Sequence, residues 1–401
     1  MCDDCNKCNS KSIKKEKLPS ISSVFMILTE RCNLACKYCF VNQNAREMSL
    51  ETAKDSLHFI VSNWDGNVKN KPSINFFGGE PMLKYEEIIK PLIEYSKKTY
   101  GEGSISFSMT SNGTLFTKEI LDYLKLNNVG ILMSLDGNKE SHDANRVFHN
   151  GSGSFDKIDS ILDYYLELYP KSILRCTLDR NNIDYMVDSI KFGIDRGFSS
   201  FFFVPNSFVN WGIEDKEKIK HQIRGFGDLY IDNIRNGKII KLNPFDEKIN
   251  QIKRINSTLK SPYVIEGKHK CGLGANRFAS IGTDGTLYGC QEMTSNCGKN
   301  DIFVIGNIYT GSDDDLRIKL LNSFNVDTVT GKEICKSCKL KPICNGGCVA
   351  NNYLQTGDLS YQADILCFWE QTLLDEAIRV TTILGEEKNQ LFKNTYFNTR
   401  R

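Results

Sequence analysis

Residues 24–40 read VFMILTERCNLACKYCF, and the fold and chemistry of the chain follow from this stretch. The apolar run Val24–Leu28 predicts a buried strand, and three cysteines follow it, at Cys32, Cys36 and Cys39. Three thiolates so close in sequence can hold three corners of a cubic iron–sulfur cluster and leave the fourth iron without a protein ligand. An open iron of this kind can bind a small molecule and pass it an electron.

The composition is that of a globular protein with nearly balanced charge. The chain has 401 residues, 40% hydrophobic and 25% charged, which is enough for one large domain and a smaller one. Its 51 basic and 49 acidic residues give a net charge of +2, so we expect neither a nucleic-acid nor a membrane partner. No apolar run approaches a membrane span, and the N-terminus MCDDCNKC does not resemble a signal peptide. We therefore expect a cytoplasmic location.

The cysteine content is high and unevenly distributed. Fifteen cysteines in a reducing compartment are not expected to form disulfides, and their spacing is that of metal ligands. After the triplet only Cys176, in a predicted strand, precedes residue 271, and we expect it to be a buried apolar residue. The last third holds the largest group, namely Cys271, Cys290, Cys297, Cys335, Cys338, Cys344, Cys348 and Cys367. Two or three metal sites are implied.

Strands and helices are predicted to alternate between residues 22 and 205. The six predicted strands are Val24–Leu28, Ile74–Phe77, Ile105–Thr110, Gly130–Leu135, Ser172–Leu178 and Phe201–Val204. The helices predicted between them include Leu50–Asn63 behind a Ser49 cap, Lys118–Leu126, Phe155–Tyr169, Ile183–Arg196 and Glu86–Lys98, the last broken or kinked at Pro91. This order predicts an α/β fold with a parallel sheet and right-handed crossovers.

The polar and glycine-rich loops of this region follow the strands. A doubly wound sheet and a partial barrel both place ligands at the carboxyl ends of their strands. Four such loops are therefore expected to converge there: the cysteine triplet, Gly78-Gly79-Glu80-Pro81, Ser111-Asn112-Gly113 and Asp136-Gly137.

The pattern Cys32-x3-Cys36-x2-Cys39 followed by Phe40 resembles the signature of the radical S-adenosylmethionine (SAM) enzymes, over roughly residues 22–205. A zinc knuckle is the alternative, but tetrahedral zinc needs four ligands and the triplet has no local fourth. The resemblance implies a partial (β/α)6 TIM-like barrel. It also implies that the three cysteines are catalytic and hold a [4Fe–4S] cluster whose fourth iron binds the amino and carboxylate groups of S-adenosylmethionine.

The same resemblance implies a set of cofactor-binding residues. Gly78, Gly79 and Glu80 match the loop that binds the methionine amino group through backbone carbonyls, where glycine permits close approach. Arg146 matches an arginine that pairs with the methionine carboxylate. The remaining implied residues are Phe40 of the signature and, for the ribose and methionine portions, Ser111, Asn112, Ser134 and Asp136.

The cysteines of the last third resemble the SPASM extension of these enzymes, a cysteine-rich domain that binds auxiliary iron–sulfur clusters. The resemblance implies one [4Fe–4S] cluster on an outer group, Cys335, Cys338, Cys344 and Cys367. It implies another on an inner group, Cys271, Cys290 and Cys348, so that the protein would hold three clusters in all. A zinc ribbon is the alternative, and it leaves three of these seven cysteines without a role.

The inner group has one cysteine fewer than its relatives. Relatives with eight cysteines place a ligand six residues after the first one, where this chain has Arg277. The inner cluster is therefore expected to have an open iron. Cys297 or a thiolate of the substrate are the candidate ligands for it.

Five segments are expected along the chain. These are a cysteine-containing tail (1–21), the barrel (22–205), a mostly helical connection (206–268), the SPASM domain (269–370) and a C-terminal helix and tail (371–401). Cys2, Cys5 and Cys8 in the tail are either part of a flexible end or ligands of a further site. About twenty residues precede the first strand, too few for the leader-binding domain that many relatives carry there.

These features lead to three hypotheses on function. The first is an enzyme that installs intramolecular thioether crosslinks in a cysteine-containing precursor peptide with a leader, taking electrons from a donor such as flavodoxin or ferredoxin. The second is an anaerobic sulfatase-maturing enzyme, whose relatives place an acidic base directly after the cysteine matching Cys290; here Gln291 follows, and Glu292 comes next. The third is an iron–sulfur electron carrier, which has no need of the Gly-Gly-Glu-Pro loop.

Overall fold

A computed structural model describes residues 18–255, 271–294, 301–324, 332–344 and 346–397. The described strands are β1 (Ser23–Thr29), β2 (Ser73–Gly78), β3 (Ser106–Ser111), β4 (Gly130–Met133), β5 (Ile173–Leu178), β6 (Ser200–Pro205), β7 (Lys241–Leu242), β8 (Phe278–Ile281), β9 (Thr286–Tyr288), β10 (Val304–Asn307) and β11 (Gly311–Ser312). The first six confirm the six predicted strands, with ends that differ by one or two residues.

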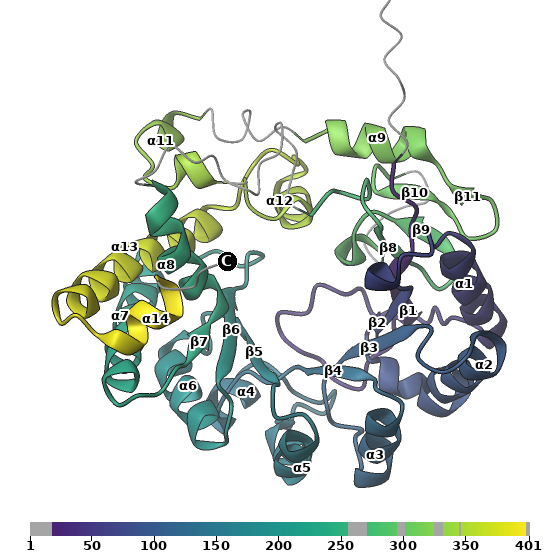
Figure 1. The fold of residues 1–401 in the computed structure, drawn as a ribbon, viewed down its shortest axis with the longest axis horizontal. Helices are drawn as coiled ribbons and strands as arrows, with labels where there is room; N and C mark the ends of the chain where they lie inside the picture. The colour runs from purple at the N-terminus through teal and green to yellow at the C-terminus, as the bar shows by residue number, and fades with distance from the viewer. Residues whose placement is uncertain (1–17, 256–270, 295–300, 325–331, 345, 398–401) are drawn as a thin grey trace, which may run out of the picture.

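The strands of the first half form a parallel, partly closed barrel. Strands β1 to β4 pair in parallel in chain order, and β5, β6 and β7 form a second parallel sheet. The two sheets meet at an isolated bridge between Ser134 and Arg175. Figure 1 shows these strands in one arc with the helices on its outer side. The α/β fold and its parallel sheet are therefore as predicted.

Helices cover the outside of this arc and form much of the C-terminal half. Their bounds are α1 (Leu50–Ser62), α2 (Lys90–Tyr100), α3 (Lys118–Leu126), α4 (Lys139–Asp143), α5 (Phe155–Leu168), α6 (Met186–Asp195), α7 (Ile213–Arg235), α8 (Asn243–Ile255), α9 (Asp314–Asn322), α11 (Glu333–Lys336), α12 (Val349–Thr356), α13 (Asp364–Glu386) and α14 (Gln390–Tyr396). Among these described helices none is both long and apolar enough to cross a membrane.

Local sequence signals explain several helix ends. Ser49 caps α1 as predicted, because its hydroxyl accepts the amide of Thr52 at 3.0 Å. Pro91 lies in the first turn of α2, where its missing amide costs nothing, and a π-helical turn over Tyr85–Ile89 precedes it. The predicted break at Pro91 therefore takes the form of a change of helix type. The helix expected over 183–196 begins as a 3₁₀ turn, Ile183–Tyr185, before α6.

The C-terminal region is part of the barrel sheet, which the sequence analysis did not anticipate. Strand β8 pairs in parallel with β1, from Ser23 with Phe278 to Met26 with Ile281, and β9, β10 and β11 extend the sheet outward. These strands have only two to four residues each, which is too short for a clear alternation of apolar and polar residues. The boundary expected at residue 370 falls inside α13.

A buried arginine ties this extension to the start of the barrel. Arg317 on α9 is 1% exposed and donates to the carbonyls of Pro19, Gly274 and Asn276 at 2.7–2.8 Å. Its guanidinium also pairs with Asp314 at 2.8 Å. A planar group with five donors can satisfy all of these acceptors at once. The loop after Cys271 is thereby held beside the first strand.

A buried polar contact joins α7, α8 and α14 behind the barrel. The hydroxyl of Tyr396 donates to Asp246, and Tyr230 donates to Tyr396 at 2.8 Å. The second carboxylate oxygen of Asp246 is buried without a hydrogen-bond partner among the described residues. Burial raises the pKa of Asp246 to about 6, although the Tyr396 hydroxyl and Lys241 lower it.

We predict that this carboxyl makes stability depend on pH between about 4 and 6. The folded protein holds the Asp246 proton up to about pH 6 and the unfolded chain only to about 4, so stability falls as pH rises through this range. The whole fall is about 3 kcal/mol, since each pH unit contributes about 1.4 kcal/mol. Asp246→Asn should flatten this dependence in thermal melts from pH 4 to 7. An unchanged slope in the variant would contradict the assignment.

Candidate active site

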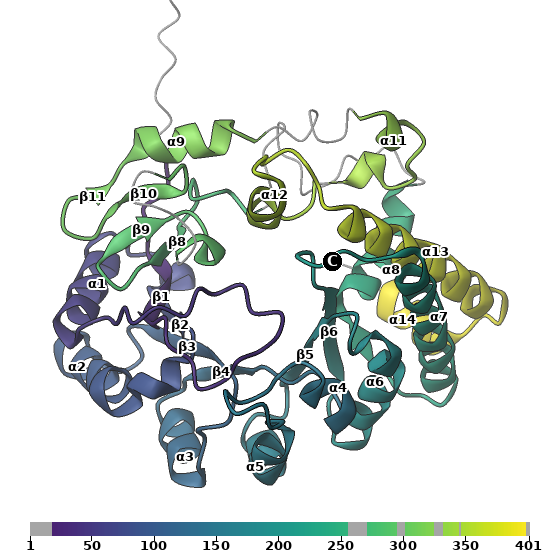
Figure 2. The same cartoon turned by 180° about the vertical axis from the view of Figure 1, so that it is seen from behind.

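The cysteine loop follows β1 and lies across the end of the barrel. Its backbone is fixed by hydrogen bonds from Ala35 to Val147 at 2.8 Å and from Lys37 to Asn145 at 3.0 Å, while the side chain of Leu34 is fully buried. Figure 2 shows this purple segment reaching from β1 across β4 toward β5. Residues about 110 positions apart in the chain are thus brought together at the carboxyl ends of the strands.

The loop brings its three thiols into one electrostatic group. Burial raises the pKa of Cys32 to about 12, and repulsion from Cys36 and Cys39 adds to the effect. Burial likewise raises the pKa values of Cys36 and Cys39. Buried neighbouring thiols lose their protons readily only when a bound cation stabilises the resulting thiolates. The donor set therefore suits an iron–sulfur cluster with three cysteine ligands.

Across the described ranges, no three His, Cys, Asp or Glu side chains are arranged to hold one metal ion.

The Gly-Gly-Glu loop after β2 packs directly on the backbone that leads into the cysteine loop. The amide of Gly79 donates to Thr29 at 2.8 Å, and that of Glu80 donates to Arg31 at 2.9 Å. A methyl group at Gly78 or Gly79 would overlap the carbonyl oxygens of Thr29 or Arg31. Glycine at these positions allows two loops of the protein to lie in close contact. The sequence alone had suggested only that glycine lets the bound cofactor approach closely.

Glu80 connects the second and third of the converging loops. Its carboxylate, 1% exposed, accepts the amides of Asn112 at 2.7 Å and Met82 at 3.0 Å and the hydroxyl of Ser111 at 2.8 Å. Burial raises the pKa of Glu80 to about 7, and these donors oppose the rise. The side chain of Asn112 in turn reaches Asn33 at 2.8 Å. One carboxylate thus fixes the Ser111-Asn112 turn beside the cysteine loop.

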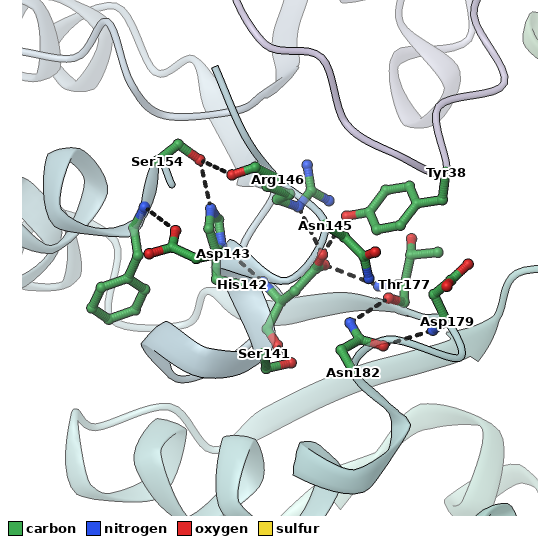
Figure 3. Close-up of polar contacts among 12 residues, drawn as sticks. Tyr38, Ser141, His142, Asp143, Asn145, Arg146, Ser154, Thr177, Asp179 and Asn182 are labelled. Atoms are coloured by element: carbon green, nitrogen blue, oxygen red, sulfur yellow. Dashed lines mark hydrogen bonds and ion pairs between the residues drawn. The ribbon is translucent and has the colours of Figure 1, made fainter. Parts of the chain in front are cut away.

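Asp136 performs the corresponding task after β4, and its partners Tyr38, Arg146 and Thr177 are labelled in Figure 3. Its carboxylate pairs with Arg146 at 3.0 Å, accepts the hydroxyl of Tyr38 and accepts the amide of Thr177 at 3.0 Å. Arg146 also lies over the ring of Tyr38, 5.3 Å from its centroid. Ser134, just before this turn, donates its amide to Ser111 at 2.8 Å.

This arrangement shows two things about the predicted residues. Arg146 is buried, as suits a binding role, and the anion it meets in the described structure is Asp136. Tyr38 was missed, although its position between Cys36 and Cys39 was a usable signal. An aromatic residue locked between two ligands has little freedom, and its hydroxyl fixes the loop to the barrel.

A cavity opens beside the cysteine loop. It has a volume of about 330 Å³ and is lined by Lys37, Tyr38, Cys39, Phe40, Asn206, Phe208, Val209 and Leu354. These residues come from the cysteine loop, from the segment after β6 and from α12. Phe40 therefore lines a cavity that lies between the barrel and the C-terminal region.

The C-terminal cysteines affect one another's protonation. Cys348 and Cys271 contribute to the raised pKa of Cys290, and Cys271 contributes to that of Cys348, which rises to about 12, chiefly by burial. Cys367 on α13 lies near an outer group, with burial and repulsion from Cys344, Cys335 and Cys338 raising its pKa to about 12. Cys176 is fully buried in β5, as expected. Cys2, Cys5, Cys8 and Cys297 lie outside the described residues.

Arg277, at the position of the missing cysteine, faces away from the inner group. Its guanidinium donates to the hydroxyl of Ser22 at 2.9 and 3.2 Å and to the carbonyl of Asn70 at 2.6 Å. Its own carbonyl accepts the amides of Ser22 and Ser23. The residue holds the C-terminal extension against the entry of β1 and is not available as a ligand.

We predict that Glu80→Ala destabilises the loops around the cysteine triplet. The substitution leaves three buried donors without an acceptor, so the free energy of unfolding should fall by about 3 kcal/mol or more. Denaturant titration of the metal-free protein measures this as a lower midpoint. Glu102→Ala is the matched control, because this exposed residue makes a surface pair with Lys97 at 3.3 Å. Equal midpoints for the two variants would contradict the role given to Glu80.

Comparison with known proteins agrees with this site. Residues 26–193 match the family model of the radical SAM superfamily. A cysteine-type anaerobic sulfatase-maturating enzyme of Clostridium perfringens (strain 13) is 22% identical over 356 residues, covering 82% of this chain and 89% of the relative.

Two solved structures share the fold. Native anSMEcpe with bound AdoMet and Cp18Cys peptide superposes with a TM-score of 0.70 at 21% identity, covering 91% of this chain and 99% of that one. Streptococcus suis SuiB bound to the precursor peptide SuiA gives a TM-score of 0.58 at 18% identity, covering 88% and 77%. Residues 26–193 are therefore a radical SAM domain, and the chain as a whole has the fold of these two proteins.

Proposed function

We propose that this protein is a radical SAM maturase that forms thioether crosslinks in a cysteine-containing peptide. The observation that carries the proposal is the three-thiol inner group, Cys271, Cys290 and Cys348, with Arg277 turned away from it. A cluster held by three thiolates keeps one iron available, and a soft thiolate of the substrate suits such an iron. The fit of this chain to structures that hold peptides supports a peptide as the substrate.

The residues would divide the work as follows. Cys32, Cys36 and Cys39 would hold the first [4Fe–4S] cluster, with S-adenosylmethionine against the loops around Gly79, Ser111 and Asp136. When bound and reduced by one electron, the cofactor supplies a deoxyadenosyl radical. The inner and outer cysteine groups would hold the two auxiliary clusters, and flavodoxin or ferredoxin would deliver the electron. The buried Tyr38 and Arg146 would keep the cysteine loop rigid beside the cavity.

The overall reaction removes two hydrogens from the peptide for each bridge. One leaves a carbon as an atom and ends on deoxyadenosine; the thiol loses a proton; and the remaining electron passes to the iron–sulfur groups. Holding the thiolate near the reacting carbon lowers the entropic cost of bond formation. The cavity between the cysteine loop and α12 is the place where both partners would meet.

Sulfatase maturation is the second candidate, favoured by the relatives and by one feature of the site. Gln291 follows Cys290 and accepts a hydrogen bond from its thiol at 3.7 Å. Its side chain is a neutral amide, which is not basic enough to take the proton. The next residue, Glu292, has a carboxylate oxygen buried near the inner cysteines, and it would have to serve as the base.

We predict that alanine at Cys32, Cys36 and Cys39 together abolishes cleavage of S-adenosylmethionine. Without the three thiols no cluster can bind the cofactor, so 5′-deoxyadenosine should fall to background and iron content by about four atoms per chain. Liquid chromatography and iron analysis measure both. Cys176→Ala, a cysteine in the barrel wall, should keep both. Cleavage by the triple variant, or uptake of zinc in place of iron and sulfide, would overturn the proposal.

We predict that the products of two peptides separate the two candidates. A cysteine-rich peptide encoded beside the gene should lose two hydrogens, about 2 Da, per bridge under reducing anaerobic conditions, and its thiols should no longer react with alkylating reagents. A peptide with a sulfatase motif should remain unchanged. An aldehyde on the sulfatase peptide, with no change in the first, would favour formylglycine formation and reject the thioether assignment.

A further inference from the structure

Lysines and cysteines alternate in the segment that carries most of the outer cysteine group. Residues 332–344 read KEICKSCKLKPIC, with four lysines and one acid. This segment therefore has a charge of +3, whereas the whole chain has only +2, so the rest of the chain is close to neutral. A local excess of positive charge on such a protein attracts molecules of negative charge.

Successive backbone turns keep the lysines of this segment beside the thiols. The amide of Cys338 donates to the carbonyl of Cys335 at 3.3 Å, and that of Lys341 donates to Cys338 at 3.1 Å. The amide of Cys344 then donates to Lys341 at 3.4 Å. Each turn advances the chain by only three residues, so charges and thiols remain close along the whole segment.

The segment packs on the helix that carries the fourth cysteine of the outer group. Leu340 is buried and packs with Leu374 of α13. Lys339 pairs with Asp375 of the same helix at 3.0 Å. Cys367 lies two turns earlier in α13, and Figure 1 shows α11 and α13 on the same side of the molecule. The positive charge therefore lies on the part of the surface that covers the outer group.

The lysine side chains reach solvent and are only weakly paired. Lys336, Lys339 and Lys341 are exposed. Lys336 pairs with Glu333 at 2.5 Å, and this pair and that of Lys339 join exposed side chains, so a partner can break them at little cost. Lys341 makes no ion pair with another described residue.

Two large apolar side chains are exposed within this positive surface. Ile334 is 76% exposed and Tyr361 is 44% exposed, with the ammonium of Lys332 3.8 Å from the centre of the tyrosine ring. Apolar anchors inside a charged rim are typical of protein interfaces, whereas nucleic acids are held mainly by contacts to phosphates. The surface therefore suits a protein partner. We call it the basic face; its members are Lys332, Ile334, Lys336, Lys339, Lys341 and Tyr361.

We propose that the basic face binds an acidic one-electron carrier protein of the flavodoxin or ferredoxin type, and that one electron passes from the carrier to the outer cluster. The carrier is oxidised by one electron, the cluster is reduced by one, and no bond forms or breaks. Opposite charges steer such encounters, and the interfaces of electron-transfer partners are small and short-lived. The inference rests on the proposed function, because it takes the outer group to hold an iron–sulfur cluster.

Binding and electron transfer test the proposal without peptide or S-adenosylmethionine. In a background with alanine at Cys32, Cys36 and Cys39, the auxiliary clusters alone are present, and an acidic flavodoxin is the probe. Calorimetry measures its Kd, and stopped-flow absorbance measures the rate at which its reduced form bleaches the clusters. A variant with glutamate at positions 336, 339 and 341 should weaken binding and slow reduction by about tenfold or more at low salt, and salt should reduce the difference.

A control variant carries the same change of net charge at a distant surface. Lys98→Glu, Lys157→Glu and Lys191→Glu together change exposed positions of α2, α5 and α6, and both measurements should stay as in the parent. Ile334→Ser should weaken binding at low and high salt alike, because it changes no charge. Equal Kd values and rates for the basic-face and control variants would overturn the proposal, as would a loss of affinity for DNA or anionic vesicles without any loss for flavodoxin.

Removal of the outer cluster tests where the electron enters. With alanine at Cys335 and Cys338, iron should fall by about four atoms per chain, and the fast reduction by flavodoxin should disappear. Equally fast reduction of the cluster that remains would reject the outer cluster as the point of entry.

This inference and the proposed thioether function can fail separately. Salt-sensitive binding of the carrier at the basic face, in a protein that forms no thioether, would reject the thioether function and keep the docking site. Thioether formation with equal carrier affinity in the basic-face and control variants would do the reverse.

Discussion

The carboxylate of Asp136 is the contact on which the geometry of this site depends. The barrel sheet is continuous from β1 to β4 and again from β5 to β7, but the two parts meet at a single bridge. At that junction Asp136 accepts an amide of β5, the hydroxyl of Tyr38 from the cysteine loop and the ion pair of Arg146. Removal of one partner of such a buried anion costs about 3–5 kcal/mol, so each of these contacts matters to the stability of the junction.

Glu80 has the corresponding role at the other side of the barrel opening, where it is again a buried carboxylate that accepts several donors. Its three donors come from its own loop and from the turn after β3, while Gly78 and Gly79 allow the same loop to lie on the backbone before Cys32. The buried carboxylates of Glu80 and Asp136 therefore fix the segments that follow β3 and β4, and both carboxylates lie close to the cysteine loop. Such a frame leaves the thiols little freedom, which suits the binding of a rigid cluster.

The C-terminal region is joined to this frame as part of the same sheet. Pairing of β8 with β1, together with Arg277 and Arg317 on backbone carbonyls, fixes the start of the inner cysteine group relative to the first strand. The distance between the cysteine loop and the C-terminal cysteines is then set by the sheet itself. A cavity lies between the cysteine loop and α12, where the two regions meet.

The sequence by itself determined the strands and helices of the first half and the cap at Ser49, because these follow from local periodicity and from capping chemistry. It placed the C-terminal cysteines in two groups only through a resemblance to a known family. It also pointed to Glu80, Asp136 and Arg146 as site residues. Only the tertiary structure decided how they are used. The roles of Tyr38 and Arg277, the close contact of Gly79 with Arg31 and the strands β8 to β11 all depend on contacts between residues far apart in the chain. Short strands and single buried charges leave no periodic signal, since their stability comes from partners that folding brings to them.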